Sequence, residues 1–337
     1  MNISRFMFVM GIQVICTHLS NMYGEITLYD FNFSPICSKA QRIRNSIYLS
    51  SSDPPSTKFT YPRWCSLTKQ KTINVFLLWY GAFSPKDRAT VNDFFASFDT
   101  DTRQEPTVST WWKAISSYKD KAGNTVPATV KVVKQLDDGA YSLGKNLKRA
   151  QIANYIQSKT TSKAFPLDSN GVYFVLTAKD VKVERFCMGS CGFHDSISVV
   201  PGMGRVVYSH VGDPSVQCPG LCAWPYAVPA YGPPGRPLVA PNGVGADGMI
   251  MNIATVLAGA ATNPFKTGYY QGDASAPLEA VTACPGIFGA GAYPGYPGEL
   301  KVDKGSKASY NAFSASGGKF LLPAIWDPMS SQCKVIA

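Results

Sequence analysis

The feature that most constrains this chain is the order in which buried-strand and amphipathic-helix patterns alternate between residues 73 and 177. Residues 73–80 read INVFLLWY, an apolar run typical of a strand that is buried on both faces. Further patterns follow in the order helix (84–98), helix (107–120), strand (128–135), helix (146–157) and strand (172–177). Strands that alternate with helices favour a layered α/β fold. We therefore predict a mixed, mostly parallel sheet flanked by helices.

Charge and composition exclude some classes of function. The chain has 337 residues, of which 45% are hydrophobic and only 16% are charged, so it can fill a sizeable core. The net charge is +10, but Lys and Arg form no cluster or stripe. Because nucleic-acid binding needs a concentrated basic surface, we expect no nucleic-acid partner. A mildly basic protein is better suited to acidic surfaces such as pectin-like polymers.

The amino-terminal region differs from the rest. Arg5 precedes the apolar run 6–16, which has the length of a signal-peptide core and is too short to span a bilayer. We predict a signal peptide over residues 1–24; the alternative is that this run is an ordinary buried strand or helix. Residues 25–72 are polar and turn-forming, and we expect them to be a loosely ordered or divergent segment before a domain over 73–337. No later run has membrane-spanning length, so no membrane span is expected.

Six cysteines follow residue 72, and their spacing allows two interpretations. They are two C-x3-C pairs and two single residues: Cys187, Cys191, Cys218, Cys222, Cys284 and Cys333. An even number of cysteines in a His-poor chain indicates disulfides and an oxidising compartment. The alternative is a zinc site made by the two C-x3-C pairs. A nucleophilic Cys191 close to His194 would require that its thiol be free.

Residues 246–265 predict one nearly all-apolar helix. Asp247 is the expected N-terminal cap and Pro264 the expected stop. With a period of 3.6, one thin polar stripe contains Asn252, Thr255, Gly259 and Thr262. Thr255 and Gly259 are four residues apart, which is the spacing of the two ligands on a zinc-hydrolase helix.

Long loops surround this helix. A Pro- and Gly-rich stretch at 219–245 precedes it, and a Tyr- and Gly-rich stretch follows it. Polar-tipped aromatics in such loops suit recognition surfaces, although they can equally serve to order the loops. The aromatic residues in question are Trp224, Tyr226, Tyr231, Tyr269, Tyr270, Tyr293 and Tyr296. The chain closes with an expected hairpin made by 308–311 and 319–325.

Three further residues could carry chemistry. His194 lies next to Asp195, so a His-carboxylate pair is available for proton transfer or metal ligation. His210 alternates along an expected strand at 205–211, and Glu279 follows the helix. The structural alternative for each is an ordinary hydrogen-bonded side chain.

At this point the chain resembles the plant phosphate-induced protein 1 family, also called the EXORDIUM-like proteins. The resemblance is carried by INVFLLWYGAFSP, STWWK, VLTAKDVKVERFCMGSCGFH, VGDPSVQCPGLCAWP, LAGAATNPFKTGYYQG, PLEAVTACPG, GAYPGYPGEL and GKFLLPAIWDP, which follow one another in that order. It covers about residues 73–337. It implies a secreted protein of the plant cell wall or apoplast, connected with brassinosteroid-dependent growth and cell expansion.

Some relatives carry a His-Glu-Leu-Ala-Glu pattern where this chain reads TVLAG. By that resemblance the first zinc ligand falls on Thr255, the general base on Val256 and the second ligand on Gly259. None of these residues can perform its role, since zinc is bound by Cys, His or carboxylate side chains and a general base must accept a proton. The helix thus resembles the active-site helix of a zincin-like fold whose catalytic groups have been replaced.

We therefore predict a zincin-like α/β body with long disulfide-tied loops, no catalytic residue, no metal and no cofactor. Its partner would be a cell-wall polysaccharide, a peptide or a receptor ectodomain. Two alternatives stay open, a zinc-dependent peptidase or other hydrolase with a rebuilt site and a structural wall protein. Lining the former metal cleft we expect His194, His210, Asn252, Glu279, Trp224 and Tyr270.

Overall fold

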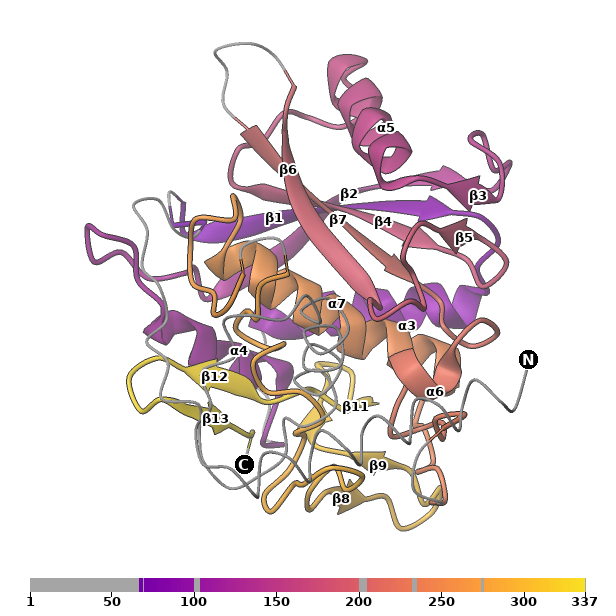
Figure 1. Ribbon diagram of the computed structural model, residues 1–337, viewed down its shortest axis with the longest axis vertical. Coiled ribbons are helices and arrows are strands. Elements are labelled where there is room, and N and C mark those ends of the chain that lie inside the picture. Colours follow the sequence, from indigo (N-terminus) through magenta and orange to yellow (C-terminus); the bar gives the residue numbers. More distant parts are fainter. Residues whose placement is uncertain are drawn as a thin grey trace, which may run out of the picture. The chain divides into compact units, whose positions relative to one another are not determined.

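A five-stranded mixed sheet forms the centre of the structure, in the order β2-β1-β4-β7-β6 (Figure 1). Four strands run parallel, and β6 pairs antiparallel with β7 at one edge. The mixed, mostly parallel sheet predicted from the alternating patterns is thus confirmed. The five strands are β1 (Thr72–Tyr80), β2 (Thr129–Asp138), β4 (Gly171–Thr177), β6 (Gly192–Ser198) and β7 (Arg205–Gly212).

This computed structural model describes residues 67–68, 70–99, 104–199, 205–231, 235–273 and 276–336. The predicted signal peptide (1–24) and residues 25–66 lie outside the described residues. Leu67 is only 2% exposed and its backbone N–H donates to the carbonyl of Ala261 (3.1 Å). The packed body therefore begins before residue 73.

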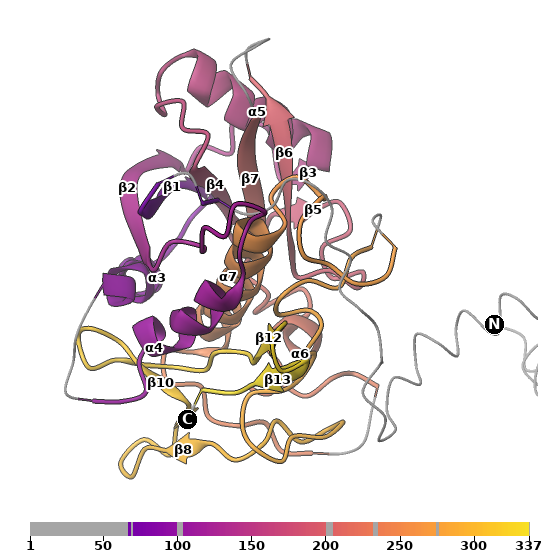
Figure 2. The same cartoon turned by 90° about the vertical axis from the view of Figure 1, so that its left-hand side faces the viewer.

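Helices cover both faces of the sheet. The longer ones are α3 (Pro85–Ala96), α5 (Arg149–Thr161) and α7 (Val244–Thr262), and the shorter ones are η1 (Ser97–Asp99), α4 (Val108–Lys113), η2 (Ala114–Ser117) and α6 (Pro219–Cys222). Figure 2 shows α5 on one side of the sheet and α3, α4 and α7 on the other. The flanked sheet expected from the sequence is therefore present.

The alternation of side chains along β1 explains why both faces need a cover. Leu77 and Trp79 pack with α3, α4 and α7, whereas Leu78 and Tyr80 pack with α5. Successive residues of a strand point to opposite faces, so an apolar run such as this one is stable only between two layers. The position of the main core between the sheet and α7 follows from the same pattern.

Helix α7 is the most deeply buried helix of the layer that contains α3, α4 and α7. It ends at Thr262, directly before Asn263 and Pro264, so the predicted stop is confirmed. Ile250, Ile253 and Leu257 are fully buried, and each such side chain contributes roughly 1.5–3 kcal/mol by leaving water. By length and composition alone α7 could cross a membrane, but 78% of its most apolar window is buried inside the protein.

Asp247 is not the N-terminal cap that the sequence predicted. The helix begins one turn earlier, at Val244, after Gly243, whose φ is +106°. Asp247 lies inside the first turns and accepts hydrogen bonds from the backbone N–H (2.7 Å) and Nδ2 (2.8 Å) of Asn242. Its exposed fraction is 1%, and burial raises its pKa to about 6 although the bonds from Asn242 act in the opposite direction.

We expect the stability contributed by Asp247 to fall with rising pH. A carboxyl group whose pKa is raised on folding holds its proton more tightly in the folded state, so this contribution is complete below about pH 4 and is lost as pH rises through about 6. Relative to wild type, the Asp247→Asn variant should gain up to about 3 kcal/mol in free energy of unfolding between pH 4 and pH 7. Urea unfolding of both proteins at the two pH values measures this change. If the difference in free energy of unfolding between the two proteins were the same at pH 4 and pH 7, the prediction would be wrong.

Three elements differ from the sequence prediction. The helix expected at 146–157 is preceded by the short strand β3 (Asn146–Leu147) and begins only at Arg149, where the Gln151 side chain accepts from the N–H of Lys148 (2.8 Å). Strand β6 lies where only loop was expected, because its residues carry no apolar run. The single hairpin expected near the C-terminus is replaced by small two-stranded ribbons.

The pairing of strands in these ribbons differs from the pairing in the predicted hairpin. Strand β8 (Lys301–Val302) pairs with β9 (Ser309–Tyr310), β10 (Ala312–Phe313) with β11 (Lys319–Phe320), and β12 (Ile325–Asp327) with β13 (Gln332–Lys334). A further two-residue strand, β5 (Lys182–Val183), pairs with β3. Gly and Pro interrupt the apolar pattern too often here for the pairing to be read from periodicity.

Candidate functional site

A cavity of about 680 Å³ lies between edge strand β6, helix α7 and the loop at 276–288. Of the residues predicted for the cleft, the structure places four on its wall: His194, Asn252, Trp224 and Glu279. Thr255 and Val256 line the same cavity. The helix, the edge strand and the loop come from distant parts of the sequence, so this site exists only in the folded chain.

His194 and Glu279 form the centre of the site. Nε2 of His194 lies 2.9 Å from both carboxylate oxygens of Glu279, and the two side chains are 6% and 12% exposed. Nδ2 of Asn263 donates to Oε1 of Glu279 at 2.7 Å. Nδ1 of His194 is buried and has no hydrogen-bond partner among the described residues. The carboxylate is thus held from two sides, and the histidine ring keeps one unused nitrogen.

Gly259 makes this arrangement possible. A Cβ added at Gly259 would lie 2.3 Å from Oε2 of Glu279 and 3.1 Å from Nε2 of His194. Real Cβ atoms do not approach other atoms as closely as the shorter distance. The space that a side chain at 259 would use is therefore filled by the His194–Glu279 pair.

The remaining polar residues of the helix are engaged with backbone. Oγ1 of Thr255 donates to the carbonyl of Met251 (2.8 Å), and Nδ2 of Asn252 donates to the carbonyl of Cys222 (2.8 Å). Val256 presents only an aliphatic side chain, which is 6% exposed. The polar stripe predicted on this helix therefore contains few free donors or acceptors.

These residues do not fit a zinc ion. Zinc prefers imidazole, thiolate or carboxylate donors arranged as a tetrahedron, yet Thr255 offers a hydroxyl and Gly259 offers nothing. Within the described residues no three His, Cys, Asp or Glu side chains gather closely enough to hold a metal. The carboxylate of Glu279, which lies beside Gly259, is hydrogen-bonded to His194 and Asn263.

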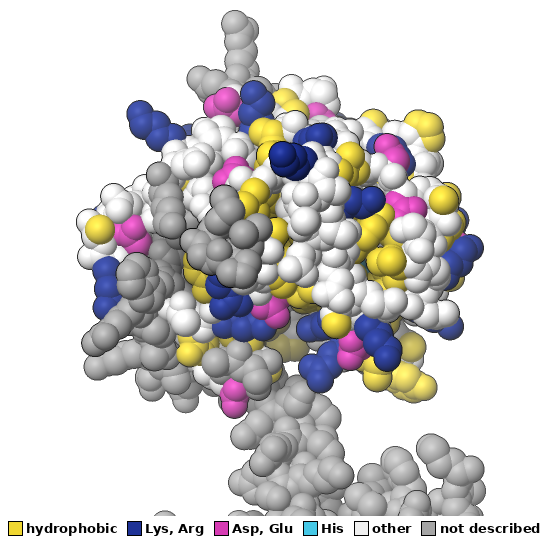
Figure 3. Space-filling view, turned by 90° about the horizontal axis from the view of Figure 1, so that it is seen from above, with side chains coloured by type: hydrophobic (Ala, Val, Ile, Leu, Met, Phe, Trp, Pro, Cys, Tyr) yellow, Lys and Arg dark blue, Asp and Glu magenta, His cyan; other side chains and the backbone are white. Residues whose placement is uncertain are grey.

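Basic side chains lie around the cavity on the β6 side. Nζ of Lys266 pairs with Oδ2 of Asp195 at 2.6 Å. The guanidinium of Arg149 lies 4.2 Å from the centre of the Phe193 ring. Burial, together with the charge of nearby Arg185, lowers the pKa of Arg149. On the molecular face drawn in Figure 3, Lys and Arg side chains are dispersed among neutral and acidic ones.

His210 is not part of the cavity. It is 1% exposed, lies on β7 between the rings of Phe186 and Phe193, and its Nε2 is 2.9 Å from Oγ1 of Thr177. Burial lowers its pKa to about 3. Because β6 pairs His194 with Ser209 rather than with His210, the two histidines belong to opposite faces of the sheet. Tyr270 is likewise absent from the described residues that line the cavity.

All six body cysteines form disulfides. The pairs are Cys187–Cys218, Cys191–Cys222 and Cys284–Cys333. The disulfide interpretation is confirmed, and the alternatives of a four-thiolate zinc site and a nucleophilic Cys191 are wrong, since no thiolate is left. The first two bonds tie the start of β6 to α6, and the third ties the Glu279 loop to β13.

Asn263 is the site residue that the sequence analysis missed. It is the C-terminal cap of α7, its backbone N–H donates to the carbonyl of Gly259 (2.7 Å), and its Oδ1 accepts from the N–H of Gly268 (2.7 Å). The only available signal was its place between the helix and Pro264. A capping Asn is common for structural reasons alone, so its contact with Glu279 could not be predicted.

Comparison with known proteins gives a consistent family assignment. The model of the "Phosphate-induced protein 1 conserved region" matches residues 65–336. The chain is 49% identical over 271 residues to Protein EXORDIUM-like 2 of Arabidopsis thaliana, covering 78% of this chain and 85% of that protein. It is 46% identical to Protein PHOSPHATE-INDUCED 1 of Nicotiana tabacum, covering 78% and 84%. It is 45% identical to Protein EXORDIUM of Arabidopsis thaliana, covering 78% and 85%.

No solved structure matches the chain. The family model spans most of the sequence, and it includes β6, α7 and the loop that carries Glu279. The three relatives each align with 78% of this chain at 45–49% identity. This chain belongs to the phosphate-induced protein 1 family, whose named members include EXORDIUM and the EXORDIUM-like proteins.

Proposed function

We propose that this chain is a secreted binding protein of the plant cell wall, built on a zincin-like scaffold that no longer performs catalysis. The observation that carries the proposal is the position of Glu279, whose carboxylate fills the space beside Gly259 and bonds to His194 and Asn263. By the resemblance to zinc hydrolases, this is where a second ligand side chain would lie. In this chain the side chain of Glu279 fills that space.

The zincin-like part of the proposal is supported by topology. Helix α7 packs against β6 and β7, and the antiparallel edge strand β6 borders the cavity beside that helix. The resemblance to a zincin-like fold predicts a former metal cleft beside the helix that carries Thr255 and Gly259. Here the cavity is present and is bordered by basic and aromatic groups, which suits recognition.

Location outside the cell is supported by the three disulfides. Such bonds persist in oxidising compartments and are rare in the cytosol. The names of the relatives, EXORDIUM and PHOSPHATE-INDUCED 1, belong to a plant family, and the resemblance links it to brassinosteroid-dependent growth. A wall polysaccharide, a peptide or a receptor ectodomain would be the partner.

Metal analysis tests the proposal directly. We expect full-length protein purified from the medium of plant cells to contain far less than one zinc per chain, and we expect a chelator to change neither its melting temperature nor its ligand binding. Stoichiometric zinc, accompanied by peptide hydrolysis that the chelator abolishes, would instead establish the zinc-dependent hydrolase. The His194→Ala variant provides the matched control for zinc binding, since it removes the imidazole of the cavity, where a zinc ion would need a ligand.

The structural-wall-protein alternative makes a different prediction in the same preparation. Insoluble wall material would retain such a protein, and no soluble fragment of that material would compete for the binding in a saturable way. A binding protein should be released by a soluble ligand. Competition experiments with solubilised wall fractions therefore separate the two roles.

A further inference from the structure

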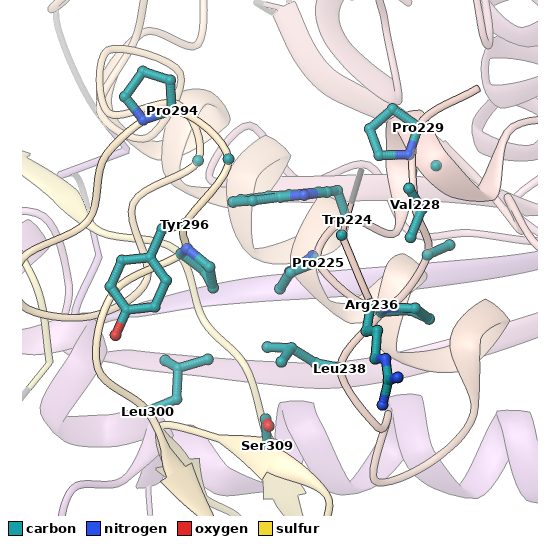
Figure 4. A pocket seen from close by; sticks show the side chains of 18 of the residues that line it. Trp224, Pro225, Val228, Pro229, Arg236, Leu238, Pro294, Tyr296, Leu300 and Ser309 are labelled. Atoms are coloured by element: carbon teal, nitrogen blue, oxygen red, sulfur yellow. The ribbon is translucent and has the colours of Figure 1, made fainter. Parts of the chain in front are cut away.

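A second hollow lies beside the cavity of His194 and has no counterpart in the resemblance to zinc hydrolases. Its volume is about 880 Å³, and it is lined by residues within 220–231, 235–238 and 285–302 and by Ser309. Figure 4 shows that Trp224 and Arg236 come from one loop and that Pro294 and Tyr296 come from the other. Trp224 also lines the first cavity, so the two sites share one wall. We call this second hollow the aromatic groove.

The surface of the aromatic groove consists largely of aromatic rings and prolines. Tyr231 is 95% exposed and Tyr293 is 64% exposed. Leu238 and Leu300 pack on the buried cluster that contains Tyr226 and Phe288. Exposed aromatic rings over an apolar base offer a large contact area at low cost in conformational entropy. This is the composition of a recognition surface.

The groove is ordered before any ligand binds. The backbone N–H groups of Tyr293 and Tyr296 each donate to the carbonyl of the other residue (3.0 and 2.8 Å), which closes a turn over Pro294 and Gly295. The φ of Gly295 is +89°, as a turn with Pro in second and Gly in third place requires. The two tyrosine rings lie 5.1 Å apart.

The described residues of the facing loop are held in place as well. The backbone N–H of Leu238 donates to the carbonyl of Pro225 at 3.0 Å. The indole of Trp224 rests against the ring of Phe288, with 6.0 Å between the ring centres. Rigid aromatic residues lose little freedom on binding, which favours affinity.

The polar side chains that line the groove are those of Arg236, Trp224, Tyr231, Tyr293, Tyr296 and Ser309, and each of them can donate a hydrogen bond. Arg236 and the indole N–H of Trp224 can only donate, and neither they nor the Tyr296 hydroxyl have a partner among the described residues. No Asp, Glu, Asn, Gln or His occurs among the described residues that line it. The groove therefore presents positive charge and positive dipole ends, which complement a ligand rich in acceptors.

A proline-rich chain has this complementary chemistry. Proline has no backbone N–H, so an extended polyproline II segment exposes carbonyl acceptors and apolar rings and offers no donor. Known recognition of such segments uses grooves lined by aromatic residues. A sugar chain carries hydroxyl donors that also seek acceptors, and the neighbouring cavity with Asp195, Asn252 and Glu279 supplies carboxylate and amide acceptors, which the described lining of the groove does not contain.

We propose that the aromatic groove binds a proline-rich peptide segment in the polyproline II conformation. The tyrosine and tryptophan rings pack against its prolines, and Trp224, Tyr296 and Arg236 donate to its carbonyls. This binding goes beyond the function proposed for the cleft, and it does not depend on whether the cleft is catalytically inert.

Titration of the full-length protein with a synthetic decaproline tests the inference. Isothermal calorimetry should show saturable 1:1 binding, and a Gly/Ser peptide of equal length should not bind. The Tyr296→Phe variant removes only a hydroxyl and should weaken decaproline binding about twofold to tenfold. The Trp224→Ala variant should weaken it about tenfold or more. Met329→Ala, an exposed residue outside both cavities, should leave it unchanged.

Three results would overturn the inference. The first is that decaproline shows no saturable binding up to about 1 mM. The second is that Tyr296→Phe and Trp224→Phe both leave decaproline binding unchanged. The third is that a β-1,4-glucan or galacturonate hexamer binds more tightly at the groove and displaces decaproline. The Phe variants keep the packing of the loops, so a folding defect cannot imitate the loss. Zinc content and hydrolysis are measured separately, and failure of the cleft proposal is therefore distinguishable from failure here.

Discussion

Gly259→Ala should lower the free energy of unfolding by about 1–3 kcal/mol, the usual cost of forcing an extra methyl group into a packed site. The usual effect of a Gly-to-Ala substitution on the free energy of unfolding has the opposite sign. Within a helix, Ala is normally more stable than Gly by up to about 1 kcal/mol. The reversal is expected because the new Cβ would lie 2.3 Å from Oε2 of Glu279, which is fixed by His194 and Asn263 and cannot simply move aside.

A double-mutant cycle isolates the cause. Glu279→Ala alone should cost about 3 kcal/mol, because it leaves buried donors on His194 and Asn263 without an acceptor. In the Glu279→Ala background the 2.3 Å clash is gone and the His194 ring is no longer fixed by the carboxylate, so it can yield at its 3.1 Å contact and Gly259→Ala should become neutral or stabilising by up to about 1 kcal/mol. The same substitution thus changes sign according to the residue at 279.

Chemical denaturation of the four proteins in the cycle measures this coupling. Gly139→Ala is a suitable external control, since a Cβ there meets nothing within 4 Å. If Gly259→Ala were equally harmful with and without the Glu279 side chain, the claim that this carboxylate fills the former side-chain space would be wrong. The proposal of a non-catalytic cleft would then lose its main support.

Replacement of Cys284 and Cys333 by Ser should lower the free energy of unfolding by about 4 kcal/mol. The bond joins residues separated by 49 positions, so its loss releases a long loop in the unfolded chain. Glu279 lies shortly before Cys284 in the sequence, and the N–H of Trp326 donates to the carbonyl of the adjacent Ala280 at 2.7 Å. We therefore expect binding in the His194 cavity to weaken along with stability.

The other two disulfides provide a matched control. Each spans 31 positions, and they are offset from one another by only four residues. Removal of Cys187–Cys218 alone leaves almost the same loop closed by Cys191–Cys222, so it should cost only about 2–3 kcal/mol. Removal of both bonds should cost about 6 kcal/mol, which is more than twice the effect of one. Both partners of a bond are replaced together, and no new thiol is created.

Guanidinium unfolding of the three paired variants gives these values. A cost for removal of both neighbouring bonds that is no more than twice the cost of removing Cys187–Cys218 alone would contradict the loop-closure account. A much smaller cost for Cys284 and Cys333 would show that β12, β13 and the Glu279 loop stay together without the bond.

Local patterns were sufficient for the elements that are apolar throughout. Residues 73–80 and 172–177 became β1 and β4, and the long apolar helix stopped at Pro264 as predicted. Strand β6 was missed because an edge strand with one face toward a cavity carries mixed residues such as Phe193, His194 and Asp195. The start of α7 was misplaced because Asp247 resembles a cap, and only the structure shows that it is buried.

The sequence by itself determined the layered fold, favoured disulfides over free thiols, and showed that Thr255, Val256 and Gly259 carry no ligand side chain, because each of these depends on residue type and local spacing. The tertiary structure alone decided that His194 meets Glu279 and that His210 does not. That outcome depends on the register of β6 against β7 and on a loop separated from His194 by 85 residues. Contacts across such distances are fixed by packing, which no local pattern records.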